Sequence, residues 1–182
     1  WITTEIIHRS KNSEEKDPLS VVGVLRRIDI TSVLFFLGIL LAVSALSSAG
    51  HLIQVATLLK DSLGNVYSIA ISIGLLSAVV DNVPMVAGAM KMYPLISPET
   101  LATAAAEELP WLRNFVVDGN FWEMLAYCAG TGGSCLIIGS AAGVAAMGME
   151  KINFIWYLKK ISGLAFIGYL AGAVTYMLMF AA

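Results

Sequence analysis

The sequence is short of charge, cysteine and histidine, and each shortage excludes a class of protein. Charged residues make up 13% of the chain and hydrophobic residues 58%, whereas an ordinary soluble domain carries about 25% charged residues. This composition favours an integral membrane protein over a soluble domain with a large core. A net charge of −2 provides no basic field for nucleic acid. The opening WITTEIIHRSKNSEEKD lacks the apolar core and cleavage site of a secretory signal.

Few residues suited to catalysis or metal binding are present. Both cysteines, Cys128 and Cys135, lie in apolar surroundings, so we expect unpaired packing thiols. The two histidines lie outside the apolar segments that are broken by polar residues, and no Ser/His or paired-Asp arrangement has a protease's pattern. The GTGGS run is not followed by Lys-Ser/Thr as a phosphate loop would be. We therefore expect neither an enzyme nor a bound cofactor.

Apolar runs with polar interruptions divide the chain. Residues 1–27 read as a polar linker with a juxtamembrane segment, and residues 28–182 as a membrane domain. The membrane domain is predicted to contain a span at 30–50, an interfacial helix at 51–64, a re-entrant hairpin at 65–93, a polar loop at 94–120, a broken helix at 121–150, an interfacial turn at 151–162 and a span at 163–182.

The distribution of charge indicates how these segments cross the bilayer. Basic residues gather before residue 30 and within 151–160, whereas the 94–120 loop is acidic. Basic residues favour the cytoplasmic side. If 65–93 crossed the membrane, the acidic loop would lie inside and the lysines of 151–160 outside. If 65–93 enters and returns on one side, every loop lies where its charge predicts.

The first interruption is Asp81-Asn82-Val83-Pro84, within the apolar run GLLSAVVDNVPMVAGAM. Pro84 lacks an N–H and disfavours helix at the preceding residue, so backbone carbonyls there are predicted to be free. The Asp81 carboxylate, the Asn82 amide oxygen and the Ser77 hydroxyl four residues earlier are hard ligands suited to sodium. Asp81 could instead hold a proton, because removal from water favours a neutral carboxyl group. Competition of sodium and proton for one group gives exchange.

The second interruption is GTGGS at 130–134. Gly130, Gly132 and Gly133 permit non-helical backbone, and Thr131 and Ser134 add hydroxyl oxygens. Two discontinuous segments that meet in the membrane are typical of a secondary transporter's binding site. Structural roles stay open at this stage: Asp81 could pair with a neighbour, Asn82 could cap a half-helix, and the hydroxyls could bond only to backbone.

Three longer stretches resemble the NhaD-type sodium/proton antiporters of the ion transporter superfamily. They are SAVVDNVPMVAGAMKMY (77–93), AGTGGSCLIIGSAAGVAAMGMEK (129–151) and FIWYLKKISGLAFIGYLAG (154–172). The resemblance implies an all-α fold of two inverted repeats, each with a re-entrant helical hairpin and an unwound transmembrane helix, of which this chain holds the C-terminal repeat. It also implies an ion site lined by Ser77, Asp81, Asn82, Thr131 and Ser134, with sodium or lithium at the last four and the proton on Asp81.

The resemblance also sets the expected partners and location. The first repeat, with its own Asp-Asn pair, is absent, and the chain begins with Trp1 rather than Met, so we expect a fragment or one half of a divided transporter. Membrane lipid, the missing N-terminal repeat and a second copy in a homodimer are the expected partners, in a bacterial inner membrane or a plastid envelope. The alternatives are a related carrier of an anion such as arsenite or a dicarboxylate, and a non-transporting membrane subunit.

Overall fold

The computed structural model describes residues 2–7 and 30–180, and these form two compact units, Trp1–Ile39 and Leu40–Ala182. The described residues form helices and no strand, which confirms the all-α prediction. In the first unit, α1 (Ile2–Ile7) occupies part of the predicted polar linker. The rest of that linker lies outside the described residues. The first unit also holds the beginning of α4 (Ile30–Ser48), which continues into the second unit.

The second unit holds the remaining helices. In chain order they are α5 (His51–Leu63), α6 (Val66–Leu76), α7 (Asn82–Met92), α8 (Pro98–Thr103), α9 (Leu109–Leu112), η2 (Arg113–Phe115), α10 (Asn120–Gly132), η3 (Gly133–Cys135), η4 (Ile137–Gly139), α11 (Ala141–Met149), α12 (Phe154–Lys160) and α13 (Ser162–Phe180). The segment predicted as a polar loop therefore contains short helices, and the predicted interfacial turn contains α12.

Glycine and asparagine set the helix boundaries early in this unit. Gly50 before α5 and Gly64 after it have φ values of 79° and 63°, in the left-handed region that glycine adopts without a steric cost. Asn65 then caps α6, because its side-chain oxygen accepts a 2.8 Å hydrogen bond from the Tyr67 N–H. Gly64 and Asn65 together turn the chain between α5 and α6.

The centre of the unit is the contact between α6 and α10. Buried side chains from both helices fill it, namely Ile69, Ile73, Met124, Leu125 and Cys128. An aromatic cluster closes one end of this core, where Tyr93 stacks on Phe115 at 5.1 Å between ring centroids and meets the edge of Phe121 at 5.0 Å. The cluster holds the 94–120 segment against α7 and α10.

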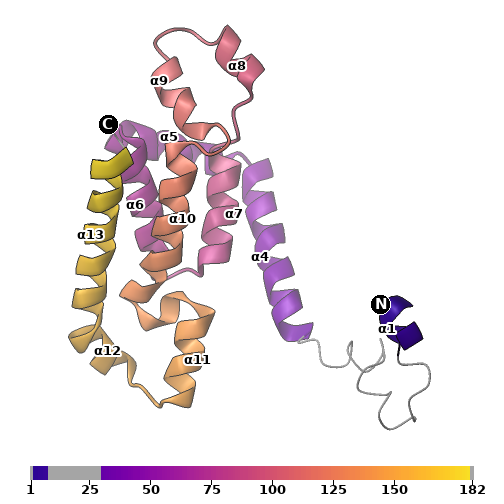
Figure 1. Ribbon diagram of the computed structural model, residues 1–182, viewed down its shortest axis with the longest axis vertical. Helices are drawn as coiled ribbons and strands as arrows, with labels where there is room; N and C mark the ends of the chain where they lie inside the picture. The colour runs from indigo at the N-terminus through magenta and orange to yellow at the C-terminus, as the bar shows by residue number, and fades with distance from the viewer. Residues whose placement is uncertain (1, 8–29, 181–182) are drawn as a thin grey trace. The chain divides into compact units, whose positions relative to one another are not determined.

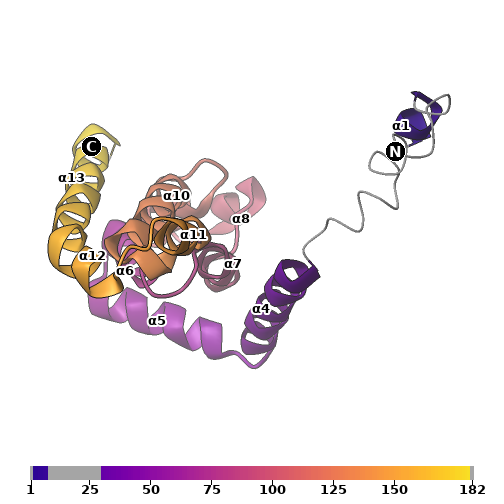
Figure 2. The same cartoon turned by 90° about the horizontal axis from the view of Figure 1, so that it is seen from below.

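The helices of the second unit run between two ends (Figure 1). α6 leads away from the end that carries α8 and α9, and α7 leads back to it, so the two form a helical hairpin. α10 starts at the same end and leads to the opposite one, where α11 and α12 lie, and α13 returns. Figure 2 shows α6, α7 and α10 grouped together, with α5 along one side. A re-entrant segment requires this hairpin arrangement, although its placement in a bilayer stays a prediction.

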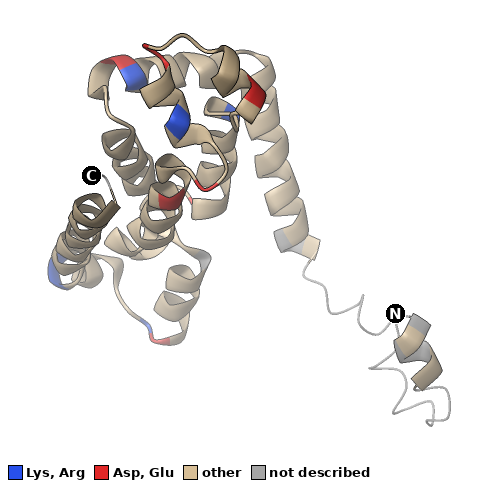
Figure 3. Cartoon of the chain, turned by 45° about the horizontal axis from the view of Figure 1, so that its top comes forward, with Lys and Arg blue, Asp and Glu red and all other residues tan. Residues whose placement is uncertain are grey.

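Most charged residues of the second unit lie at its two ends (Figure 3). The helices α6 and α13 contain no Asp, Glu, Lys or Arg, while α7 contains only Lys91 and α10 only Glu123. By length and composition, α13 is the one helix among the described residues that could cross a membrane unaided. Val33–Ser48 and His51–Leu63 pass the same test together, and their bend of 74° is that of a broken span or of a re-entrant loop.

Candidate functional site

The first break separates α6 from α7 and covers Ser77 to Asp81. The chain leaves α6 through short turns, because Ala78 N–H donates to Leu75 O (3.1 Å) and Val79 N–H to Leu76 O (3.0 Å). Pro84 is buried in the first turn of α7, where backbone N–H groups have no helical partner and proline is tolerated. The sequence prediction placed Pro84 in the break, and this is wrong: the break ends before it.

Ser77 is fully buried in the first break. Its hydroxyl lies 2.7 Å from the carbonyl oxygen of Gly74 in its own helix and 3.2 Å from that of Ala129 in α10. The sequence left open whether this hydroxyl has a structural role. The structure shows one, since the hydroxyl bonds to backbone carbonyl oxygens. It also joins α6 to the last turn of α10, where carbonyls lose their intrahelical partners.

Asp81 is the N-cap residue of α7, with φ −50° and ψ 143°, and its carboxylate makes no capping hydrogen bond. It is half-buried, as is Asn82, the first residue of the helix. Among the described residues, no group of three His, Cys, Asp or Glu side chains converges as a metal cluster. An oxygen-only site for a hard cation would instead combine the carboxylate with amide, hydroxyl and backbone oxygens.

The second break follows α10 and covers residues 133–140, through η3 and η4, before α11 begins. The sequence prediction placed it at 130–134, which is too early, because Gly130 and Gly132 are helical residues of α10 and only Gly133 lies in the break. Glycine permits a break without requiring one. A Cβ at Gly132 would overlap the carbonyl oxygen of Gly74, so this glycine allows α6 and α10 to approach closely.

The two hydroxyl residues of GTGGS differ in their surroundings. Thr131 is half-buried in α10, and its hydroxyl donates a 2.7 Å hydrogen bond to the Tyr127 carbonyl one turn earlier. Ser134 lies in η3 with an exposed side chain, and its carbonyl accepts a 2.8 Å hydrogen bond from the Tyr157 hydroxyl. A hydroxyl that donates its proton keeps lone pairs that can accept or ligate.

The structure brings the two breaks into contact. An ideal Cβ on Gly139 would lie 2.6 Å from the carbonyl oxygens of both Ser77 and Ala78, which means that only a glycine fits there. Of the predicted site residues, Ser77 therefore contacts the second break through its backbone. Asp81 lies three residues beyond Ala78, the other residue of this contact. Within the part of the chain that the structure describes, the hydroxyls of Thr131 and Ser134 are not hydrogen-bonded to Asp81 or Asn82.

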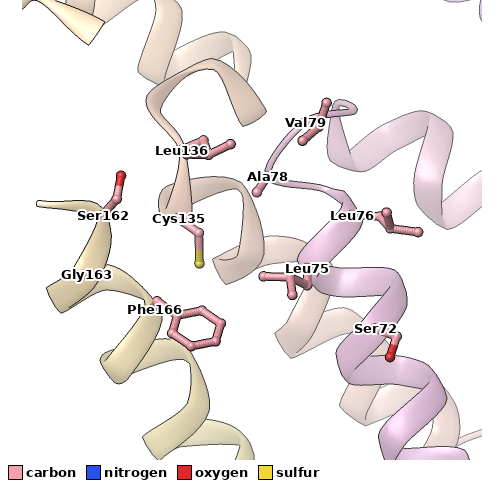
Figure 4. A pocket seen from close by; sticks show the side chains of 10 residues that line it. All are labelled: Ser72, Leu75, Leu76, Ala78, Val79, Cys135, Leu136, Ser162, Gly163 and Phe166. Atoms are coloured by element: carbon pink, nitrogen blue, oxygen red, sulfur yellow. The ribbon is translucent and has the colours of Figure 1, made fainter. Parts of the chain in front are cut away.

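A cavity of about 720 Å³ lies beside the meeting point of the breaks. Figure 4 shows it between the end of α6, the second break and the start of α13, with the Leu75, Cys135 and Phe166 side chains around it. Its lining is mostly apolar, so it does not suit a bare cation, and Asp81 does not line it.

Sequence reasoning missed several residues that shape this region. Gly74 and Gly139 set the close approach of the segments, as does Gly132, which was predicted only as part of the break. Gly139 and Gly143 have the four-residue spacing typical of close helix contacts, whereas Gly74 has no glycine at that spacing. Tyr157 lies in the segment predicted as an interfacial turn, and nothing in its local sequence indicates that its hydroxyl bonds to a carbonyl 23 positions earlier.

Comparison with known proteins gives a family match and several relatives. The citrate transporter family (CitMHS) matches residues 16–112. Sodium/proton antiporter 1 and sodium/proton antiporter 2 of Arabidopsis thaliana are 49% and 46% identical to the chain over 177 residues, which is 97% of its length. The Na(+)/H(+) antiporter NhaD of Alkalimonas amylolytica is 32% identical over 162 residues, or 88% of the chain.

The chain spans only part of each relative. It covers 27% of the first Arabidopsis protein, 38% of the second and 29% of the Alkalimonas protein. No solved structure gives a significant match to the chain. The comparisons therefore bear on this stretch of the relatives and not on their other segments.

Proposed function

Because this chain belongs to the citrate transporter family, we propose that it supplies the C-terminal half of the ion site of a secondary transporter that exchanges sodium or lithium for protons. The relatives with 46% and 49% identity carry the name sodium/proton antiporter. Membership of a transporter family supports an integral membrane protein that moves ions rather than an enzyme, with the ions as cargo and no resident cofactor.

The observation that carries this proposal is the position of Asp81 and the lack of a capping hydrogen bond to its carboxylate. Its carboxylate is half-buried, makes no capping hydrogen bond and stands where a helical hairpin breaks. An ionisable group in a membrane segment is costly to retain, which makes a functional role the default interpretation. The carboxylate is therefore the proposed exchange group, neutralised in turn by a sodium ion and by a proton.

The remaining ligands are proposed around this carboxylate. Asn82 offers an amide oxygen beside it, and Thr131 and Ser134 offer hydroxyl oxygens at the second break. Ser77 contributes by joining the first break to the last turn of α10 through its bond toward Ala129. These oxygens are the ligand type that a hard cation selects, and carbonyls freed at the breaks can complete the shell.

Partners and location follow from the same proposal. The missing N-terminal repeat would complete the site with its own hairpin, lipid would cover the exposed apolar helices, and a second copy would form the homodimer. The bacterial inner membrane and the plastid envelope are the proposed locations, and the higher identity to the plant relatives than to the bacterial one favours the plastid envelope.

An anion carrier is the second candidate, since the matching family is described as a citrate transporter. Neither break, 77–81 or 133–140, contains an Arg or Lys, and the carboxylate of Asp81 would repel an anion at the first break. Cation exchange is therefore the function that the site supports best.

Asp81→Asn tests the proposal in the assembled transporter, reconstituted in proteoliposomes with a pH-sensitive dye inside. The amide keeps the size of the side chain but can neither hold a proton nor neutralise sodium. We expect sodium-driven proton movement to fall by at least about 100-fold, since a site that needs a charge loses its exchange group.

Asp118→Asn is the matched control. Asp118 is exposed, lies in the 94–120 segment and has a φ of 58°, a conformation that asparagine also adopts. This variant is expected to exchange like the unaltered protein. Unchanged exchange by Asp81→Asn would contradict the proposal, and uptake of labelled citrate without a sodium response would favour the anion carrier.

A further inference from the structure

The short helix α12 contacts the second break through one side chain. The Tyr157 hydroxyl donates a 2.8 Å hydrogen bond to the carbonyl oxygen of Ser134. Ser134 lies just after α10, where the helical ladder ends and carbonyl oxygens need partners from elsewhere. Tyr157 therefore provides the Ser134 carbonyl with a hydrogen-bond donor that the local backbone does not supply.

The position of Tyr157 is itself fixed by its helix. Asn153 caps α12 by accepting hydrogen bonds from the N–H groups of Ile155 (2.8 Å) and Trp156 (3.3 Å). At the other end, Ile161 N–H donates to the Tyr157 carbonyl at 2.8 Å, directly before α13 begins. A donor on such a constrained element loses little conformational entropy when it bonds.

The last turn of α10 and the break that follows it are thus each held by a side chain from another segment. Ser77 of the hairpin lies 3.2 Å from the Ala129 carbonyl in the last turn of α10, and Tyr157 of α12 holds the Ser134 carbonyl. The two contacts come from segments on opposite sides of the break in the sequence. Together they fix the direction in which the chain leaves α10.

We propose that Tyr157 is a positioning residue that holds the Ser134 carbonyl and so directs the exposed Ser134 hydroxyl toward the transported cation. The inference rests on the proposed function. The Tyr157 bond occupies one lone pair of the Ser134 carbonyl oxygen, and the ligand that we assign to Ser134 is its exposed side-chain hydroxyl. Tyr157 itself acts through Ser134 and does not touch the ion.

The two cysteines report on this contact without any added probe residue. Cys135 follows Ser134 within η3 and is 5% exposed, whereas Cys128 lies within α10 and is fully buried. If the break loosens, Cys135 becomes accessible while Cys128 stays packed against α6. The rates at which N-ethylmaleimide labels the two thiols therefore separate a local change from general unfolding.

The test compares Tyr157→Phe with Tyr127→Phe in the assembled transporter. Both changes remove a hydroxyl that donates to a carbonyl, but the Tyr127 hydroxyl bonds to Tyr169 O in α13 (3.0 Å), away from the break. For Tyr157→Phe we expect labelling of Cys135 to be about 3- to 10-fold faster and the sodium KM about 3- to 10-fold higher, the effect of one hydrogen bond. Tyr127→Phe is expected to leave both within about twofold.

Each result decides the inference. Unchanged Cys135 labelling in Tyr157→Phe, equal effects of both variants, or faster labelling with an unchanged sodium KM would overturn it. A similar acceleration at Cys128 would also overturn it, because the change would then be unfolding. If the unaltered protein moves no sodium, the proposed function fails separately, and the labelling rates still decide whether Tyr157 fixes the break.

Discussion

At the scale of single residues, Gly130 and Gly132 show that neighbouring glycines can have different roles in one helix. Both lie in α10. A Cβ at Gly132 would overlap the Gly74 carbonyl oxygen, whereas a Cβ at Gly130 would meet nothing within 4 Å. The close approach of α6 and α10 therefore depends on Gly132 and not on Gly130.

Gly132→Ala is expected to lower the free energy of unfolding by about 1–3 kcal/mol, because the methyl group meets backbone that cannot move without separating the helices. Gly130→Ala is the matched control and is expected to stabilise α10 by about 0.5–1 kcal/mol, since alanine restricts the unfolded chain. Thermal unfolding of both variants in detergent measures the difference. Equal transition temperatures would show that the helices can repack around the added methyl group.

Two of the hydroxyl groups predicted as ion ligands also bond to backbone. Ser77 and Thr131 were predicted as ion ligands, and both hydroxyls lie within hydrogen-bond distance of backbone carbonyls. Such bonds are a common local use of Ser and Thr in helices. Their role as ligands stays a prediction, and it depends on the lone pairs that a donating hydroxyl retains.

At the scale of elements, the end of the second break is set by Ser140. Its side chain caps α11 by accepting a 3.0 Å hydrogen bond from Gly143 N–H. The cap satisfies one of the backbone N–H groups that the first turn of every helix leaves without a partner. α11 therefore begins at Ala141 because the residue before it can accept this bond.

Ser140→Ala is expected to cost about 0.5–2 kcal/mol of stability, concentrated in α11, because the cap is lost. Ser140→Asp keeps an acceptor at the same position and is expected to recover most of this loss. Hydrogen exchange followed by mass spectrometry on residues 141–149 measures the effect. Exchange in α11 that is the same in all three proteins would refute the capping role.

At the scale of the whole molecule, the arrangement of the second unit makes a prediction about membrane sidedness. The outer ends of α6 and α7 lie at the end that carries α8 and α9, and α12 lies at the opposite end (Figure 1). If the hairpin is re-entrant, residues before and after it must face the same side of the membrane. Residues of α12 must face the other side.

Single cysteines at the exposed positions Asp61, Asp118 and Lys159 test this with a membrane-impermeant maleimide applied to sealed vesicles. The native Cys128 and Cys135 are buried and are expected to contribute little background. Asp61→Cys and Asp118→Cys should label from one side and Lys159→Cys from the other, because charged loops do not enter lipid. Labelling of the first two from opposite sides would mean that the hairpin crosses the membrane.

The sequence by itself determined the membrane class, the helical fold and the existence of two interrupted segments. Long uncharged runs must form helices in lipid because every backbone N–H and C=O group needs a partner there. Asp81, Pro84 and the glycines of GTGGS were visible as exceptions to these runs. Backbone hydrogen bonding within a helix and its interruption both depend on residues close in the sequence, so they can be predicted from neighbouring residues alone.

Only the tertiary structure decided where the breaks begin and what holds them. The first break lies before Pro84 and the second after Gly132, because Pro84 fits in the first turn of a helix and Gly132 is needed against Gly74. The bonds that Ser77 and Tyr157 direct at free carbonyls join residues 52 and 23 positions apart. Such contacts depend on how the helices pack, and the spacing of residues along the chain does not reveal that packing.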